Sequence, residues 1–317
     1  MLSSSKMIQS AAGEIPAAQL GHIQCHEHIY LRKGPSYESN PALCMEDYDR
    51  SLRELQEYRA AGGGAIVDAQ PGFFGRDPRM LRKLSEDSGV QILAVTGFHK
   101  LMFEEPGSPL QGMTEDQLTA HFAGEITTGM ADPEGNPTDI RAAFVKVAFE
   151  PGGLTHPVYG KLFRAAARAA AHTGAPVLVH TEKNTDMLEL LAFFNGFGVS
   201  SDRVLICHLD RTNYDAAYHC KVLQTGCCFC YDSVNRTKYV SHEQELDLIT
   251  AVCAAGFEDR IVLSLDTTAQ RLRAYGAPDM GLDYILTTYI PMLLDRGITR
   301  EQTEKMCRLN AAGFLTK

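Results

Sequence analysis

Short apolar runs alternate with longer amphipathic segments along almost the whole chain, and this alternation limits the fold more than any other feature. Short runs bounded by turn residues indicate buried strands, and the segments between them indicate crossover helices. Repeated strand–helix units predict an α/β fold of the (β/α)8, or TIM barrel, type, with a doubly wound open sheet as the alternative. The predicted strands are residues 23–26, 65–69, 92–96, 143–148, 177–180, 204–208, 227–231 and 261–265.

The predicted helices lie between these strands, and glycine residues that can form a left-handed cap follow several of them. The longest connection, residues 103–139, has room for an additional helix at residues 115–127. The loops after the seventh and eighth strands are candidates for a pocket, because barrel active sites are built from such loops. The other predicted helices are residues 48–61, 78–88, 157–173, 186–194, 216–224, 242–255 and 283–296.

Residues of metal-binding type stand at or near the C-terminal ends of five predicted strands. Side chains alternate along a strand, so His26 and His28 share a face and can bind one ion together, whereas Cys25 and Glu27 are expected to face away, as is Cys207. A barrel brings its strand ends to one mouth, which an open sheet does not easily do for the first, fourth, fifth, sixth and eighth strands. The predicted metal ligands are His26, His28, Lys146, His180, His208 and Asp266.

Composition restricts the partners and the location of the chain. A formal net charge of -9 over 317 residues argues against nucleic acid or an anionic membrane as a partner. Neither a signal peptide nor a membrane-spanning stretch is evident, so we expect a cytoplasmic protein with one domain over residues 1–317. The nine cysteines are an odd number without a second Cys-x-x-Cys pair, which predicts buried reduced thiols at residues 227–230 rather than a zinc ribbon.

The predicted ligands suit divalent metal chemistry. Neutral imidazoles and carboxylates bind zinc and similar ions, and four histidines with one aspartate could hold one ion or two. Lys146 has no lone pair as an ammonium, but burial among apolar strand neighbours would favour its neutral amine. A neutral amine can add carbon dioxide to give a carbamate, whose anionic oxygens can bridge two metal ions.

This order of residues, from His-x-His to the aspartate on the eighth strand, resembles the phosphotriesterase branch of the amidohydrolase superfamily from Gly21 to Phe314. The resemblance implies two divalent ions, zinc with manganese, cobalt or iron as alternatives. His26, His28 and Asp266 would hold the more buried ion. His180 and His208 would hold the more exposed ion. N6-carboxylysine at Lys146 and a hydroxide would bridge the two ions, and the catalytic Asp266 would relay a proton to the leaving group. Relatives also suggest a homodimer.

Within this branch the sequence most resembles the lactonases that open phosphorylated sugar lactones. The similar pieces are residues 180–182, residues 208–211 and residues 236–239. Members that degrade paraoxon differ, because they have an acidic residue where Arg211 stands and a histidine where Ser233 stands. The resemblance therefore implies a hydrolase that acts on a phosphorylated lactone, and it puts hydrolysis of phosphotriesters in doubt as the main activity.

Cationic residues in the last two loops favour a small anionic substrate. The position of Lys238 matches the lysine that contacts phosphate in those lactonases, and gathered cations would attract a phosphate monoester. The same charges could instead be ordinary surface residues. Other lactones, N-acyl amino acids or phosphotriesters are alternative substrates on the same site, and a non-catalytic binding protein is the alternative of another class. The predicted substrate-binding residues are His99, Arg211, Arg236, Lys238, Tyr239, Arg271 and Arg273.

Overall fold

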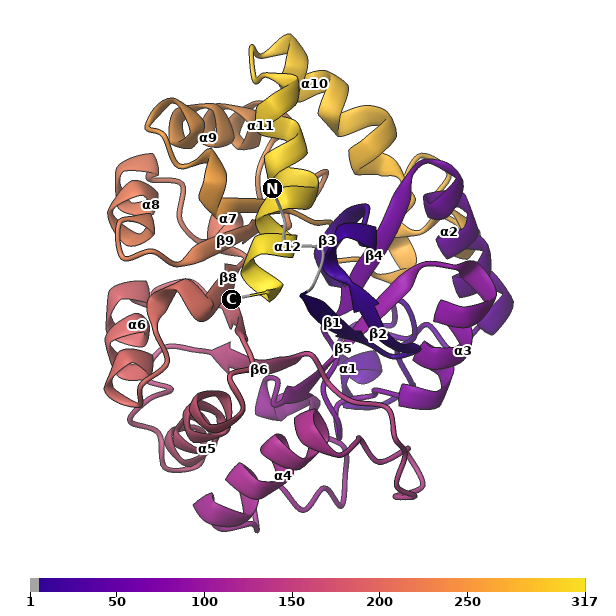
Figure 1. Cartoon of the computed structure of the whole chain (residues 1–317), viewed down its shortest axis with the longest axis vertical. Coiled ribbons are helices and arrows are strands. Elements are labelled where there is room, and N and C mark those ends of the chain that lie inside the picture. The colour runs from indigo at the N-terminus through magenta and orange to yellow at the C-terminus, as the bar shows by residue number, and fades with distance from the viewer. Residues whose placement is uncertain (1–5, 317) are drawn as a thin grey trace.

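The computed structural model describes residues 6–316, and a sheet of eight strands lies at its centre. Each strand pairs in parallel with its neighbour in the sequence. The helices surround these strands in Figure 1, which confirms the predicted TIM barrel and rejects the open sheet. The strands are β3 (His22–Glu27), β4 (Gly63–Asp68), β5 (Gln91–Gly97), β6 (Phe144–Phe149), β7 (Val177–Thr181), β8 (Val204–Cys207), β9 (Cys228–Tyr231) and β10 (Ile261–Leu263).

The helices begin and end at residues that suit those positions. Thr114 and Gln117 form a capping box at the start of the additional helix in the long connection, and Gly89 and Gly174 adopt the left-handed conformation after two others. None of the helices within residues 6–316 is long and apolar enough to cross a membrane. The α-helices are α1 (Pro35–Ser39), α2 (Tyr48–Ala60), α3 (Pro78–Ser88), α4 (Glu115–Thr127), α5 (Pro157–Thr173), α6 (Met187–Gly196), α7 (Leu209–Thr212), α8 (Ala216–Leu223), α9 (His242–Ala254), α10 (Ile290–Asp295), α11 (Arg300–Glu304) and α12 (Asn310–Leu315).

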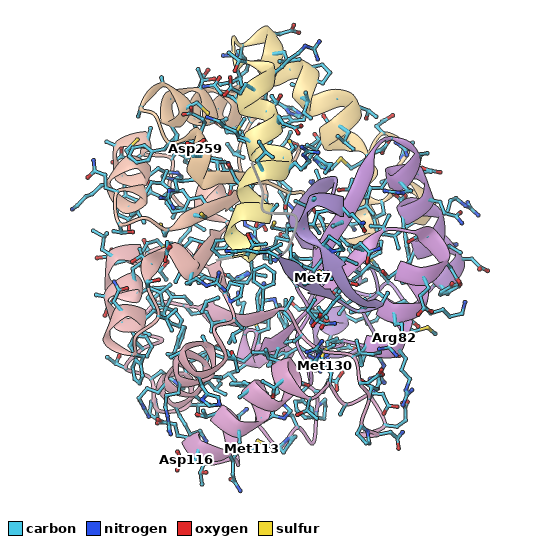
Figure 2. All side chains as sticks on the ribbon, viewed as in Figure 1. Met7, Arg82, Met113, Asp116, Met130 and Asp259 are labelled. Carbon is cyan, nitrogen blue, oxygen red and sulfur yellow. The ribbon has the colours of Figure 1, made fainter. Side chains whose placement is uncertain are left out.

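The single helix predicted at residues 283–296 is wrong in detail, because a π-helical turn at Ile285–Tyr289 precedes α10. A hairpin of β1 (Met7–Ser10) and β2 (Gly13–Pro16) was not predicted either. The hairpin and α12 lie across one end of the barrel in Figure 1, and Figure 2 marks the hairpin by its label on Met7. Their buried apolar side chains belong to the same core cluster as those inside the barrel. This end is therefore closed, which leaves the opposite end for a site.

Side chains connect β3 to β10, where the barrel closes. The Ser264 hydroxyl oxygen accepts a hydrogen bond from the backbone N–H of Cys25 at 2.7 Å. The carboxylate of Glu27 accepts hydrogen bonds from the backbone N–H groups of Leu265 at 2.7 Å and Thr267 at 3.0 Å. These bonds fix the segment that follows β10 against the end of β3, and both segments carry predicted metal ligands.

Candidate metal centre

The six predicted metal ligands lie together at the open end of the barrel, and all of them are buried. His26 and His180 belong to strands β3 and β7, whereas His208 and Asp266 follow the ends of β8 and β10. His208 and Asp266 have φ angles of 68° and 50°, a region that non-glycine residues rarely adopt. Strained backbone of this kind is concentrated at functional sites, where the surrounding structure holds it in place.

Three donors converge in the deeper half of the centre. The Nε2 atoms of His26 and His28 lie 3.9 Å and 3.6 Å from Oδ1 of Asp266, and the ligand atoms of the three residues lie within 4.8 Å of one another. Lys146 lies beside them, with Nζ 3.2 Å from Nε2 of His26. Two imidazoles and a carboxylate are a donor set that suits zinc and similar divalent ions, so the residues fit the metal that the sequence predicts.

The shallower half contains the other two histidines. Nε2 of His208 lies 2.8 Å from Nδ1 of His180, so these two nitrogens face each other. Burial is the largest cause that lowers the pKa of both imidazoles, to about 4 for His180 and well below the ordinary value for His208. Both rings are therefore neutral near pH 7, which is the form that binds a metal ion.

Lys146 is fully buried on β6, next to His26. Burial lowers the pKa of its ammonium, although Cys207, Asp266 and Asp232 oppose this effect. The environment thus favours the neutral amine, the form that a carbamate requires.

Asp232 connects the two halves of the centre, and it was not among the predicted site residues. Its Oδ2 lies 3.1 Å from Nδ1 of His26, and its Oδ1 lies 2.7 Å from Nδ1 of His208. Burial alone would raise the pKa of Asp232, but the two histidines lower it below the ordinary value. One buried carboxylate therefore fixes the orientation of one ring in each half. Its place directly after β9 is the signal that could have revealed it, because the other ligands also follow strand ends.

A second carboxylate missed by the sequence analysis supports His180. Oε1 of Glu182 lies 3.0 Å from Nε2 of this imidazole and 2.6 Å from Nζ of Lys100. The hydrogen bond to His180 is the largest cause that lowers the pKa of Glu182 to about 2. Glu182 is therefore ionised at neutral pH.

Two of the predicted substrate-binding arginines lie against Asp266. Nη1 of Arg211 is 2.7 Å from Oδ2 of Asp266, and Nη2 of Arg236 is 3.2 Å from the same oxygen. Burial alone would raise the pKa of Asp266, but Arg236 and Arg211 hold it well below its ordinary value. One oxygen of this carboxylate thus faces the histidines, and the other faces the two guanidinium groups.

A cavity of about 400 Å³ opens above the centre. Lys238 and Tyr239 are exposed residues of its wall, and the Tyr239 ring lies 4.7 Å from the Lys238 ammonium and 5.0 Å from the Arg211 guanidinium. The buried His99 lies deeper, with its ring 5.0 Å from that of His180. The residues named from the sequence that line this cavity are His26, His28, His99, His180, His208, Arg211, Arg236, Lys238, Tyr239, Asp266 and Arg271.

The structure separates Arg271 from Arg273. Arg271 lines the cavity and donates hydrogen bonds to backbone carbonyl oxygens, among them that of Asn235 at 2.8 Å. Arg273 is not part of the described cavity wall; its guanidinium pairs with Glu57 at 2.6 Å and with Asp283 at 3.2 Å. Both arginines were predicted to bind substrate, but they belong to separate short helical turns of this loop, and only Arg271 lines the described cavity.

The predicted orientation of two cysteines is wrong. Cys25 and Cys207 belong to the core cluster inside the barrel, and Cys207 lies among the donors around His26 and Asp232. Irregular pairing of β3 with β4 on both sides of Ile23–Gln24 breaks the simple alternation on which the prediction for Cys25 was based. Cys227, Cys228 and Cys230 are buried, as predicted, and no disulfide is formed among the described residues.

Comparison with known proteins agrees with this geometry. The sequence pattern of the phosphotriesterase family matches residues 6–315. The chain belongs to this family. A phospho-furanose lactonase from Mycoplasmopsis synoviae is 30% identical over 313 residues, which cover 94% of this chain and 88% of the relative. The protein is accordingly a hydrolytic enzyme of a metal-dependent family, with candidate metal-ligand groups at the open end of its barrel.

Two solved structures are similar over nearly the whole chain. An amidohydrolase from Mycoplasma synoviae superposes with a TM-score of 0.91 at 29% identity and covers 99% of this chain and 92% of its own. A lactonase from Listeria monocytogenes superposes with a TM-score of 0.87 at 27% identity and covers 98% of this chain and 99% of its own. The similarity thus extends over the entire barrel.

Proposed function

We propose that this enzyme is a binuclear metal-dependent lactonase that opens a phosphorylated sugar lactone. The observation that carries the proposal is a buried set of six residues of metal-binding type beneath a cavity with an exposed cation at its rim. Lys238 supplies that cation, because it lines the cavity and is exposed. The phospho-furanose lactonase that is 30% identical supports this substrate class.

The proposed roles follow the two halves of the centre. His26, His28 and Asp266 would hold the buried ion, and His180 and His208 the exposed ion, with zinc as the expected metal and manganese, cobalt or iron as alternatives. Lys146 would join both after its amine adds carbon dioxide and loses a proton. Bound divalent ions lower the pKa of a coordinated water and polarise a carbonyl group.

The residues around the centre would orient the substrate and move a proton. Lys238 would pair with the phosphate at the rim, and Arg211 and Arg236 hold the carboxylate of Asp266 in place. Asp266 would accept a proton from the attacking water and return it to the ring oxygen as the carbon–oxygen bond breaks. The products would be a hydroxy acid and, near neutral pH, a released proton. A cytoplasmic homodimer remains our prediction for the intact enzyme, and sedimentation would test the dimer.

A panel of sugar lactones, with and without a 5-phosphate, tests the substrate. We expect the zinc- or manganese-loaded protein, with bicarbonate present, to release protons only from the phosphorylated lactones, as read with a pH indicator. Turnover of unphosphorylated lactones or N-acyl amino acids, without turnover of the phosphorylated compounds, would contradict the proposal.

Lys238→Ala tests the phosphate contact. Loss of an interaction made equally in the ground state and the transition state raises KM and leaves kcat nearly unchanged. One charge-assisted contact contributes about 1.5–3 kcal/mol, so KM for a phosphorylated lactone should rise on the order of 10- to 100-fold. Lys183→Ala is the matched control, because Lys183 is also exposed but lines a neighbouring cavity instead. An equal effect of both substitutions would indicate general electrostatic attraction only.

A further inference from the structure

Glu182 occupies a position from which it affects only one half of the centre. Its Oε1 lies 3.0 Å from Nε2 of His180, on the side of the ring opposite to Nδ1. Nδ1 of His180 faces Nε2 of His208 at 2.8 Å. One ring nitrogen of His180 therefore points to the shallower half of the centre, and the other contacts Glu182. Glu182 follows β7 directly after Thr181, which makes its carboxylate a near neighbour of the ligand on the same strand.

The carboxylate of Glu182 is itself held from the other side. Nζ of Lys100 lies 2.6 Å from the same Oε1 atom and 3.9 Å from Oε1 of Glu150. The Lys100 side chain is only 18% exposed, so this ion pair is partly shielded from solvent. Lys100 therefore restrains Glu182 against His180, and the three residues form a chain from the cavity wall to the imidazole.

The other three histidines lack this contact. His26 and His208 both use Asp232, which joins the two halves. Nδ1 of His28 has no hydrogen-bond partner among the described residues. A change at Asp232 thus alters both halves of the centre, whereas a change at Glu182 alters a ligand of the shallower half alone.

We propose that Glu182 is a positioning residue for His180 that sets the affinity of the more exposed ion without affecting the deeper one. A carboxylate that accepts a hydrogen bond from the free N–H of a ligating imidazole fixes its tautomer, orients the ring and makes the other nitrogen a stronger donor. Held by Lys100, Glu182 would keep the proton of His180 on Nε2 and leave Nδ1 free to bind. This inference rests on the binuclear centre of the proposed function.

Titration of the metal-free protein with cobalt(II) alone tests this role. Visible absorption reports the coordination of each ion, and the metal content after dialysis reports the stoichiometry. We expect the wild type to bind two equivalents. Glu182→Gln keeps the size of the side chain but removes its charge. It should bind the first ion as the wild type does and the second ion about 10- to 100-fold more weakly.

Glu150→Gln is the matched control. This substitution removes one negative charge near Lys100, as Glu182→Gln does. In the described structure the Glu150 side chain contacts Lys100 and Tyr159 but not His180. The control should bind both ions with wild-type affinity. Circular dichroism and the melting temperature establish whether both variants are folded. Because 34% of the Glu182 side chain is exposed, we expect its substitution to leave the protein folded.

The outcomes separate this inference from the proposed function. A wild type that binds two cobalt ions, together with a Glu182→Gln variant whose second affinity lies within twofold of it, overturns the positioning role alone. Equal weakening of both ions in Glu182→Gln, or equal losses in Glu182→Gln and Glu150→Gln, also overturns it. A wild type that binds no cobalt overturns the binuclear centre and this inference with it.

Discussion

At the scale of single residues, the centre depends on how each ligand is held as well as on which ligands are present. His208 and Asp266 adopt left-handed backbone conformations; His208 directly follows β8, and Asp266 lies in the segment after β10. Asp232 then contacts Nδ1 of His208, and Arg211 contacts Oδ2 of Asp266. Contacts of this kind position the donor atoms before any ion binds, which lowers the cost of forming the site.

Lys146→Ala should lose metal and activity together. The variant removes the amine that we propose to be carboxylated, so no carbamate would bridge the two ions. Loss of a residue that only orients a metal ligand lowers activity roughly 10- to 100-fold, and we expect a larger loss here because the ligand itself is removed. Metal analysis and proton release measure the two effects. Partial recovery with a short carboxylic acid would support the carbamate, whereas full metal content and activity in the variant would exclude a bridging role.

Asp232→Asn should weaken both metal sites. The amide retains the shape of the side chain but cannot accept hydrogen bonds at both of its terminal atoms, so either His26 or His208 loses its partner. We expect cobalt affinity to fall about 10- to 100-fold, with the two ions affected more evenly than in Glu182→Gln. Unchanged affinity for both ions, measured in the same titration, would show that the rings are held by other contacts.

At the scale of elements, an ion pair attaches helix α4 to the outer side of the barrel. Arg76 donates to Oε2 of Glu125 at 3.0 Å and to the backbone carbonyl of Val95 in β5 at 2.7 Å. The Thr96 hydroxyl donates to the same Glu125 oxygen at 2.6 Å. Only 2% of the Arg76 side chain and 5% of the Glu125 side chain are exposed, so the pair is almost completely removed from water.

Glu125→Gln should therefore be strongly destabilising. It leaves the buried Arg76 without its counter-charge, a change that typically costs about 3–5 kcal/mol in the free energy of unfolding. Urea denaturation measures the loss. Asp116→Asn is the control on the same helix: Asp116 forms an ion pair with Arg168 but is 84% exposed, and Figure 2 labels it at the outer edge of the molecule. Equal stability of the two variants would contradict the importance of burial.

At the scale of the whole molecule, distant segments meet through buried carboxyl groups. Glu54 on α2 accepts hydrogen bonds from the backbone N–H groups of Ala274 and of Leu282, which lie beyond β10. Burial is the largest cause that raises the pKa of Glu54 from 4.5 to about 7, although both backbone donors lower it. The folded protein therefore retains this proton over a pH range in which the unfolded chain has already lost it.

This difference predicts how stability depends on pH. Between about pH 4.5 and pH 7 the unfolded state binds fewer protons at Glu54 than the folded state, so its contribution to stability falls as the pH rises. Glu54→Gln removes this contribution. The stability of the wild type relative to the variant should fall by on the order of 3 kcal/mol across this range, as measured by urea denaturation at both ends. An equal difference at both pH values would contradict the raised pKa.

The sequence predicted the secondary structure well where a periodic pattern and a cap coincide. Helices α3, α4 and α5 have the predicted bounds, and the eight barrel strands lie at the predicted places. Local alternation and capping depend on neighbouring residues, and these are visible in the chain itself. Prediction was weaker for Ile285–Tyr289 and for Cys25, because a π-helical turn and an irregular strand pairing depend on packing against other elements.

The sequence by itself determined the barrel, the identity of the six ligand types and their place at its open end. A ligand type is fixed by its side chain, and the strand order fixes the end at which it lies. Only the tertiary structure decided which partners hold these ligands: Asp232 and Glu182 for the histidines, Arg211 and Arg236 for Asp266, and the separation of Arg271 from Arg273. Such partners come from different strands and loops, and their distances follow from the closure of the barrel, which no local pattern contains.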